Sequence, residues 1–264
     1  AEADAEQVDD RIRGSFDTGR GGFRGSQKFP PHSSLLYSLY RIADNPGEPG
    51  ASGLDEFNRK TLDAMSLGGL HDHLQGGFFR YCVDPAWTIP HFEKMLYDQA
   101  MLLWVYSLAY RIYGRELYRE SARGIVSFLK ESLYDDGLYC AGLDADTDHR
   151  EGATYLWKRE ELEGVLDPEE FSLLEGSFHL PREGNFEGLI HLLRSRSGGV
   201  GVDGTGGGEI APPLSPELRR VADKLLSLRS KRPQPFRDRK KLTFWNALAG
   251  IGLIQAFRYL QEPS

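Results

Sequence analysis

The first candidate for chemistry is a stretch rich in glycine, aromatic and histidine residues at positions 68–100. It contains three of the seven histidines, His71, His73 and His91. An imidazole can both accept and donate a proton near neutral pH, because its ordinary pKa is about 6.5. No metal site is predicted, since an extended backbone would point His71 and His73 apart and no two histidines have the i, i+4 spacing of a helical ligand pair. The stretch favours acid–base catalysis.

A helix predicted from Phe92 carries the end of this stretch. A rotation of about 100° per residue places His91, Lys94 and Asp98 on one face of that helix. Two interpretations stay open. Lys94 and Asp98 can form an ordinary i, i+4 ion pair on a solvated face. Alternatively, because the other sides of the helix are apolar, these polar groups line a buried cavity.

A second candidate is the acidic segment 143–152, which contains Asp144 and Asp146. Its DxDxD start is similar to a calcium loop, but His149 stands where an EF-hand needs glycine and Tyr155 where it needs glutamate. Carboxylates beside aromatic rings suit sugar recognition, because carboxylates accept hydrogen bonds from hydroxyls and rings pack on the apolar faces of pyranoses. The competing interpretation is a solvated acidic turn.

Composition excludes several classes of protein. The 32 Lys and Arg residues against 39 Asp and Glu leave a formal net charge of −7, which argues against nucleic acid as a partner because little would neutralise a run of phosphates. No run approaches the roughly 18 consecutive apolar residues of a membrane helix. Cys82 and Cys140 form no CxxC motif, so neither a disulfide framework nor a structural zinc is indicated. We expect a soluble, cytoplasmic protein without a cofactor.

The elements that must position these residues are helices. Apolar residues recur at helical spacing through most of the chain, without the alternation of strands and helices that marks Rossmann and TIM-barrel folds. An all-α fold is therefore predicted. The seven predicted helices are 33–43, 55–67, 92–113, 116–133, 158–166, 216–229 and 242–260.

The loops between these helices carry further expectations. Two of them, 68–91 and 135–157, are too long and too aromatic to be simple connections, so we expect function there. Short β-hairpin arms are predicted within them and at one end of the helical assembly. Residues 197–213 are predicted to be a flexible Gly/Pro loop. The formal GxGxxG inside this loop runs into more glycine and proline instead of opening a helix, which argues against dinucleotide binding.

Several motifs together resemble one protein family. They are GGF from Gly21 with KFP from Lys28, the stretch GGLHDHLQGGFFRYCVDPAWTIPHFEKMLYDQAMLL from Gly68, DADTDHREGATYLW from Asp144, GNFEG from Gly184, and Arg232-Pro233 with residues 238–246. Over nearly its whole length the chain is similar to the YyaL-type family of thioredoxin-domain-containing proteins, which includes the spermatogenesis-associated homologue.

This resemblance implies an architecture. Members of the family carry an N-terminal thioredoxin-like domain followed by an (α/α) barrel of six helical hairpins, similar to N-acylglucosamine 2-epimerases and six-hairpin glycosidases. The sequence contains no CxxC motif, and seven helices are about half of what a closed barrel needs. We therefore expect residues 1–264 to form a single (α/α) barrel domain or its N-terminal half. Apolar flanks at 102–110 and 248–257 would then need covering, by a missing C-terminal half of the barrel or by a second copy in a homodimer.

The resemblance also implies a function. KMLYDQA is similar to the K-x-x-Y-D-H-A pattern of epimerase-like sugar isomerases, with Gln99 where that histidine lies near the sugar. The first hypothesis is therefore a sugar epimerase or isomerase that moves a proton by histidine chemistry. His91 would be the base, His73 its partner, Arg80 the group that polarises the carbonyl and Trp87 the stacking platform.

The remaining predicted site residues are Glu93, a further catalytic group, and the substrate-binding residues Tyr81, Lys94, Tyr97, Asp98, Asp144, Asp146 and Glu151. Two alternatives stay open. A glycoside hydrolase would use two carboxylates, from Glu93, Asp144 and Asp146. A non-catalytic module would bind a sugar or a redox partner.

Overall fold

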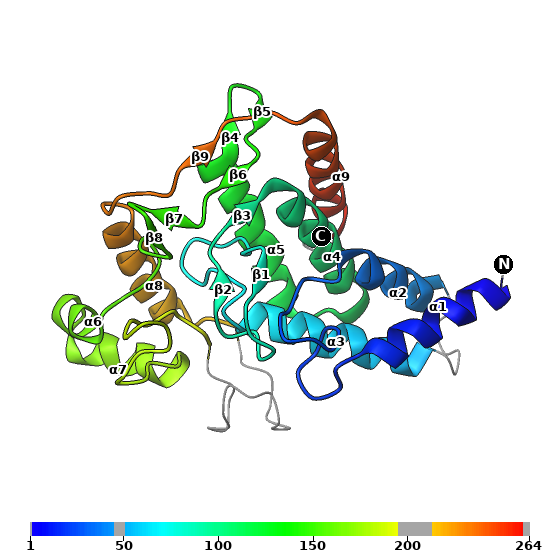
Figure 1. Cartoon of the computed structure of the whole chain (residues 1–264), viewed down its shortest axis with the longest axis horizontal. Helices are drawn as coiled ribbons and strands as arrows, with labels where there is room; N and C mark the ends of the chain where they lie inside the picture. The colour runs from blue at the N-terminus through cyan, green and yellow to red at the C-terminus, as the bar shows by residue number, and fades with distance from the viewer. Residues whose placement is uncertain (1, 45–50, 195–212, 261–264) are drawn as a thin grey trace.

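The computed structural model describes residues 2–44, 51–194 and 213–260, and most of them are helical (Figure 1). The expected class, helical with short hairpin arms, is confirmed. The loop predicted at 197–213 lies outside the described residues, apart from Pro213. The helices are α1 (Glu2–Ser15), α2 (His32–Asp44), α3 (Ala51–Leu67), α4 (Leu96–Tyr113), α5 (Glu116–Phe128) with the π-helical turn η1 (Leu129–Leu133), α6 (Arg159–Val165), α7 (Pro168–Ser177), α8 (Pro216–Arg229) and α9 (Thr243–Tyr259).

Helix α1 was absent from the sequence prediction, and α7 was not among the seven predicted helices, although Asp167-Pro168 is typical of a helix start. Helix α1 carries few apolar residues, so its periodicity is weak. Helix α7 is specified by its first turn: Pro168 occupies the first position, and Asp167 and Glu170 form a reciprocal capping box. Local chemistry therefore starts this helix, although its apolar pattern is short.

The prediction of a helix from Phe92 was wrong at its start. Helix α4 begins only at Leu96, because Lys94 and Met95 pair with a strand instead. The proposed helical face with His91, Lys94 and Asp98 therefore does not exist. His91 and Lys94 lie on two different short strands, and only Asp98 is helical.

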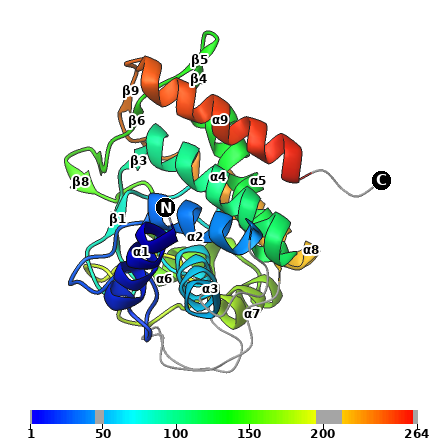
Figure 2. The ribbon, with the colours of Figure 1, turned by 90° about the vertical axis from the view of Figure 1, so that its right-hand side faces the viewer.

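Helix α4 is the centre of the helical assembly. It packs against α2, α5 and α9, and Figure 2 shows α9, α4 and α2 lying one below another. Helix α9 approaches closely because Gly252 faces α4: a Cβ there would lie 2.6 Å from the carbonyl oxygen of Ala100. Since α9 follows α4 by more than a hundred residues, this contact joins distant parts of the chain.

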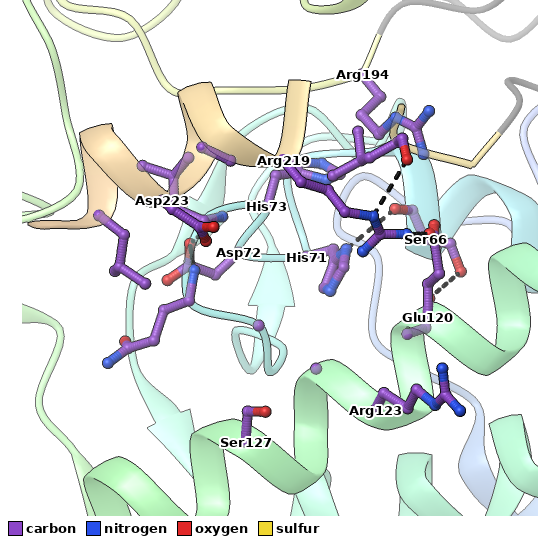
Figure 3. Close-up of a pocket in the computed structure, with 18 of the residues that line it drawn as sticks. Ser66, His71, Asp72, His73, Glu120, Arg123, Ser127, Arg194, Arg219 and Asp223 are labelled. Atoms are coloured by element: carbon purple, nitrogen blue, oxygen red, sulfur yellow. Dashed lines mark hydrogen bonds and ion pairs between the residues drawn. The ribbon is translucent and has the colours of Figure 1, made fainter. Parts of the chain in front are cut away.

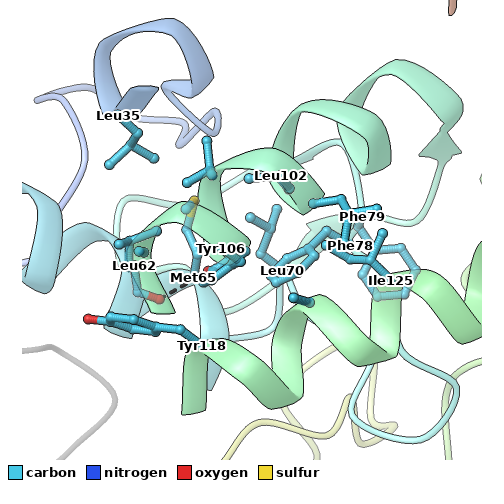
Figure 4. Packing of buried hydrophobic residues seen from close by; sticks show 14 of the residues in the cluster. Leu35, Leu62, Met65, Leu70, Phe78, Phe79, Leu102, Tyr106, Tyr118 and Ile125 are labelled. Atoms are coloured by element: carbon cyan, nitrogen blue, oxygen red, sulfur yellow. Dashed lines mark hydrogen bonds between the residues drawn. The ribbon is translucent and has the colours of Figure 1, made fainter. Parts of the chain in front are cut away.

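The main hydrophobic core lies between these helices and the histidine-rich loop. Figure 4 shows Leu62 and Met65 of α3, Leu102 and Tyr106 of α4, and Phe78 of the loop packed together. A smaller apolar cluster lies under α6, α7 and α8, centred on residues such as Trp157 and Leu225. The described chain thus has two apolar centres.

The two flanks predicted to be uncovered differ. The flank at 102–110 is largely buried, since α9, α2 and α5 cover α4, so that expectation was wrong. On α9, in contrast, Ile254 is 59% exposed and Phe257 is 72% exposed. The apolar outer face of α9 is therefore open to solvent.

Nine two-residue strands build the hairpin arms in the described part of the chain. All pairs are antiparallel, and β6 is the central strand of the three-stranded sheet β3–β6–β9. The strands are β1 (Tyr81–Cys82), β2 (Pro90–His91), β3 (Lys94–Met95), β4 (Tyr134–Asp135), β5 (Leu138–Tyr139), β6 (Gly142–Leu143), β7 (Asp146–Thr147), β8 (Arg150–Glu151) and β9 (Arg237–Asp238).

Candidate functional site

Strands β1 and β2 bring the first group of polar residues together. Tyr81 pairs with His91, and the backbone N–H of Arg80 donates to the carbonyl of Glu93 at 2.9 Å. The connecting loop is held by Asp84, whose carboxylate accepts hydrogen bonds from the backbone N–H groups of Ala86, Thr88 and Ile89. Side chains ten or more residues apart therefore meet at one place.

Four charged or titratable side chains meet there, which we call the imidazole cluster: Arg80, His91, Glu93 and Glu151. Arg80 Nη1 lies 2.8 Å from Glu93 Oε2, and His91 Nδ1 lies 2.7 Å from Glu151 Oε1. His91 Nε2 is 4.0 Å from Glu93 Oε2. All four side chains keep between 22% and 42% of their surface exposed, so the cluster is open to a solute.

Tyr97 supports Arg80 from α4. Its hydroxyl accepts from Arg80 Nε at 3.0 Å, and its ring lies 5.0 Å from that of Trp245 on α9. Burial alone would lower the pKa of Arg80, but its hydrogen bonds to Glu93 and Tyr97 outweigh that effect and raise it. The guanidinium is thus fixed in place as a permanent positive charge.

Aromatic rings flank the cluster on one side. The Tyr81 ring stacks on His91 at 5.2 Å and on Phe29 at 4.6 Å. Phe29 is 53% exposed. This stack holds the imidazole in one orientation and presents an apolar surface beside it.

The acidic segment forms a second hairpin beside the cluster. Strands β7 and β8 pair Asp146 with Glu151, and Asp148 and His149 adopt left-handed φ values of 52° and 60°, as a two-residue type I′ turn requires. The hairpin carries Glu151 to His91. Asp144 and Asp146 are exposed on the same segment, one and three residues after the end of β6.

A second group of charges, the interior ion cluster, consists of Asp72, Lys94 and Arg229. Lys94 Nζ lies 2.7 Å from Asp72 Oδ2, and Arg229 binds both oxygens of Asp72 at 2.9 and 2.8 Å. Burial alone would raise the pKa of Asp72, but the charges of Arg229 and Lys94 hold it well below its usual range. Burial lowers the pKa of Lys94 to about 8, which leaves the ammonium protonated at pH 7.

Lys94 is therefore not placed to bind a substrate, contrary to the sequence prediction. Its side chain is 0% exposed, and Nζ also donates to the carbonyl of Gly76 at 2.9 Å. The rings of Phe128 and Phe79 lie 4.4 and 5.0 Å from the ammonium and stabilise it further by cation–π contacts. The reason is the strand alternation that turns Lys94 inward where Glu93 turns outward.

His73 is likewise buried, and it does not join His91. Its Nε2 lies 3.0 Å from the carbonyl of Gly68, and its ring is 4.9 Å from that of His71. Burial lowers the pKa of His73 well below its usual range, and lowers that of His71 to about 4. Both imidazoles are neutral at pH 7, and His73 is buried whereas His71 is partly exposed.

Trp87 and Asp98 are also interior residues. Trp87 is 1% exposed, and its Nε1 donates to the carbonyl of Arg20 at 3.1 Å, so its ring is not available as a stacking platform. Asp98 is 2% exposed and lies 3.2 Å from His32 Nε2. Burial raises the pKa of Asp98. Trp87 packs into the main hydrophobic core, and Asp98 lies on α4, most of whose residues are buried.

Sequence reasoning missed Asp72 and Arg229. Asp72 stands between two histidines, and Arg229 lies 157 residues further along the chain. Nothing in the local sequence signals their pairing. Only the docking of α8 against the histidine-rich loop brings them together.

A pocket of about 490 Å³ lies on another side of the histidine-rich loop, between that loop, α5 and α8 (Figure 3). Its lining includes His71, Glu120 and Arg219 but no member of the imidazole cluster. Arg219 and Glu120 form an ion pair across it.

Within the described ranges, no three His, Cys, Asp or Glu side chains are grouped so as to hold a metal ion. Among the described helices, none has the length and apolar character needed to traverse a bilayer.

No protein-family profile matches this chain. Among curated proteins, an uncharacterized protein of Caenorhabditis elegans is 30% identical over 274 residues, and spermatogenesis-associated protein 20 of Homo sapiens is 31% identical over 270 residues. These alignments include 94% and 90% of this chain but 37% and 33% of the relatives, so the chain spans about a third of their length. The expected similarity to the spermatogenesis-associated homologue is confirmed, whereas the thioredoxin-like domain stays a prediction.

Sugar epimerases are also similar to this chain. Cellobiose 2-epimerase of Bacteroides fragilis is 36% identical over 64 residues, which are 24% of this chain and 16% of that protein. Among solved structures, a sugar epimerase from a ruminal bacterium matches 53% of this chain and 40% of its own, with a TM-score of 0.45 and 16% identity. Cellobiose 2-epimerase from Spirochaeta thermophila matches 99% of this chain and 82% of its own, with a TM-score of 0.44 and 15% identity.

Proposed function

We propose that this protein binds a sugar at the imidazole cluster and moves a proton on it, as a sugar epimerase or aldose–ketose isomerase would. The observation that carries the proposal is the hydrogen-bonded pair of His91 and Glu151, 2.7 Å apart, beside the fixed guanidinium of Arg80. The similarity of a 64-residue segment to a cellobiose 2-epimerase supports the choice of a sugar as substrate.

The roles of the residues follow from their hydrogen bonds. A carboxylate can only accept, so Glu151 holds the proton on His91 Nδ1 and leaves the lone pair on Nε2. Nε2 is the base that takes the proton from the carbon next to the carbonyl of an open-chain sugar. The electron pair of that C–H bond forms a double bond to the carbonyl carbon, the π pair of the carbonyl moves to its oxygen, and Arg80 stabilises the resulting enediolate.

The return of the proton decides the product. Delivery from Nε2 to C1, with transfer of the O2 hydroxyl proton to O1, gives a ketose from an aldose, and delivery to the opposite face of C2 gives the epimer. His73 is buried and bonded to Gly68, so His91 is the imidazole that serves both steps. A single base suits the isomerisation directly, whereas epimerisation requires the enediolate to present its other face.

Glycoside hydrolysis is a second candidate, favoured by the position of Asp144. The β3–β6 register pairs Lys94 with Leu143, so Glu93 and Asp144 are neighbours one step further along. Retaining glycosidases hold two carboxyl groups about 5 Å apart. The general acid of such an enzyme needs apolar surroundings that keep it protonated, whereas Asp144 is exposed and Glu93 is ion-paired with Arg80. Proton transfer by His91 is therefore the better proposal.

The test is solvent deuterium exchange at C2 of cellobiose, glucose and mannose, followed by NMR. The unaltered protein should incorporate deuterium, and His91→Gln should slow the exchange by about 10²–10⁴-fold. His179→Gln, which alters a histidine outside the cluster, is the matched control and should keep the full rate. The proposal fails if the unaltered protein exchanges none of these protons, and release of reducing ends from oligosaccharides would replace it with hydrolysis.

A further inference from the structure

Phe236 is an aromatic residue that no role described so far explains. It precedes β9 and is 71% exposed, which is as open as the outer face of α9. When a ligand covers a large apolar side chain that is exposed to water, the free energy of the system falls.

Strand register shows which residues lie beside Phe236. In the three-stranded sheet, Lys94 pairs with Leu143 and Leu143 pairs with Arg237. The next residues across the sheet are Glu93 just before β3, Asp144 just after β6 and Phe236 just before β9. The backbone N–H of Asp144 donates to the carbonyl of Phe236 at 2.9 Å. These three residues therefore form the next row across the sheet.

Burial shows which way the row faces. Side chains in one row of a sheet point to the same side, and the next row points to the other. Lys94 and Leu143 are buried, whereas Glu93 is partly exposed and Asp144 and Phe236 are exposed. The row of Glu93, Asp144 and Phe236 thus faces outward, on the side where Glu93 contacts Arg80 and His91.

We propose that Phe236 is the stacking platform of the sugar site: the apolar face of a pyranose ring packs on its ring, while Asp144 and Glu93 accept hydrogen bonds from the hydroxyls at the edge of the sugar. This inference rests on the proposed function of the imidazole cluster. It also gives the part predicted for Trp87, which is buried, to a residue whose ring is open to a ligand.

The carboxylates of the row are acceptors for the hydroxyl groups of a ligand. Arg80 already neutralises Glu93 at 2.8 Å, and the Asp144 carboxylate is exposed. A pyranose has the required combination, with C–H groups on one face for the ring and hydroxyl donors around its edge for the carboxylates. The row therefore adds affinity and orientation, whereas His91 and Arg80 act on the reacting carbon.

The experiment compares Phe236→Ala with Phe257→Ala, by calorimetric titration with cellobiose and with glucose. Phe257 is 72% exposed on α9, so the two variants remove the same side chain from equally open positions. Phe236→Ala should raise the Kd of the sugar about tenfold, Phe236→Trp should retain binding, and Phe257→Ala should bind as the unaltered protein does. In exchange assays, Phe236→Ala should raise KM more than it lowers kcat.

The outcomes separate the two proposals. Deuterium exchange by the unaltered protein together with an unchanged Kd in Phe236→Ala overturns the platform and leaves the proposed function. Sugar binding that Phe236→Ala weakens, without any exchange at C2, supports the platform and overturns the proposed reaction. Failure of the unaltered protein to bind either sugar overturns both.

Discussion

Glu93 and Lys94 are adjacent in the sequence, and each belongs to a cluster of charges with a different purpose. Lys94 turns inward to the interior ion cluster, and Glu93 turns outward to the imidazole cluster. The interior ion cluster joins residues of which the farthest apart are separated by 157 positions, and α8 is held to the histidine-rich loop through it. The two clusters therefore differ in how far their charged side chains are buried.

The two clusters differ in whether their polar atoms all have hydrogen-bond partners. The Asp72 carboxylate accepts from Lys94, from both arms of Arg229 and from the backbone N–H groups of Leu74 and Gln75. A buried charge with all its partners present is a structural feature, because removing one partner leaves another charge uncompensated. His91 Nε2, in contrast, has its nearest carboxylate oxygen at 4.0 Å and remains open to a substrate.

The strongest test of this contrast is Asp72→Ala. It leaves Lys94 and Arg229 as buried cations without their carboxylate, so the free energy of unfolding should fall by about 3–5 kcal/mol, or the protein should fail to fold. Urea unfolding followed by circular dichroism measures the change. Asp146→Ala removes an exposed carboxylate and should stay within about 0.5 kcal/mol of the unaltered protein. Equal effects of the two variants would contradict the structural role of the interior ion cluster.

Acid should lower the stability of the protein through the histidines whose pKa burial lowers. Burial lowers the pKa of His71 and of His191 to about 4, whereas both would titrate near 6.5 in the unfolded chain. The unfolded state therefore binds more protons between about pH 6.5 and pH 4, and the stability present above pH 6.5 is lost as the pH falls through this window, by about 3 kcal/mol for each imidazole.

Urea unfolding at a series of pH values measures this loss. The slope of stability against pH should become smaller in His71→Gln and in His191→Gln. This comparison of slopes is independent of any constant destabilisation by the substitutions. If neither substitution flattened the slope, the acid sensitivity would not come from these two imidazoles.

The smallest expected effect comes from Glu151→Gln, which keeps the shape of the side chain and removes its charge. The substitution withdraws the negative charge that stabilises the protonated imidazole during proton transfer, so kcat for exchange at C2 should fall on the order of tenfold, with little change in unfolding free energy. Asp146→Asn alters the residue paired with Glu151 across the hairpin and should retain kcat. A large loss of stability in Glu151→Gln would make this pair structural, like that of Asp72.

Local signals in the sequence predicted much of the fold. Helix α8 begins and ends where the periodicity placed it, with Ser215 as a side-chain cap and Pro216 in the first turn. The Asp136-Gly137 turn between β4 and β5 has left-handed φ values of 47° and 82°, which this residue pair adopts readily. Such signals act over a few residues, which is why they can be read without the fold.

The candidate site was predictable only in part. His91, Arg80, Glu93 and Glu151 were singled out by residue type and do meet in the structure. Lys94, His73 and Trp87 were singled out on the same grounds, and they lie in the interior. Residue type indicates what a side chain can do, but it does not say on which side of a strand or loop the side chain lies.

The sequence by itself determined where helices form, which loops carry polar and aromatic residues, and which chemistry those residues could perform, because these properties depend on composition and on spacing over a few turns. The tertiary structure decided the rest. Two-residue strands are too short to show a period, so only their pairing reveals that Glu93 faces outward and Lys94 inward. Contacts such as Arg229 with Asp72 depend on the packing of distant segments, and no local pattern encodes them.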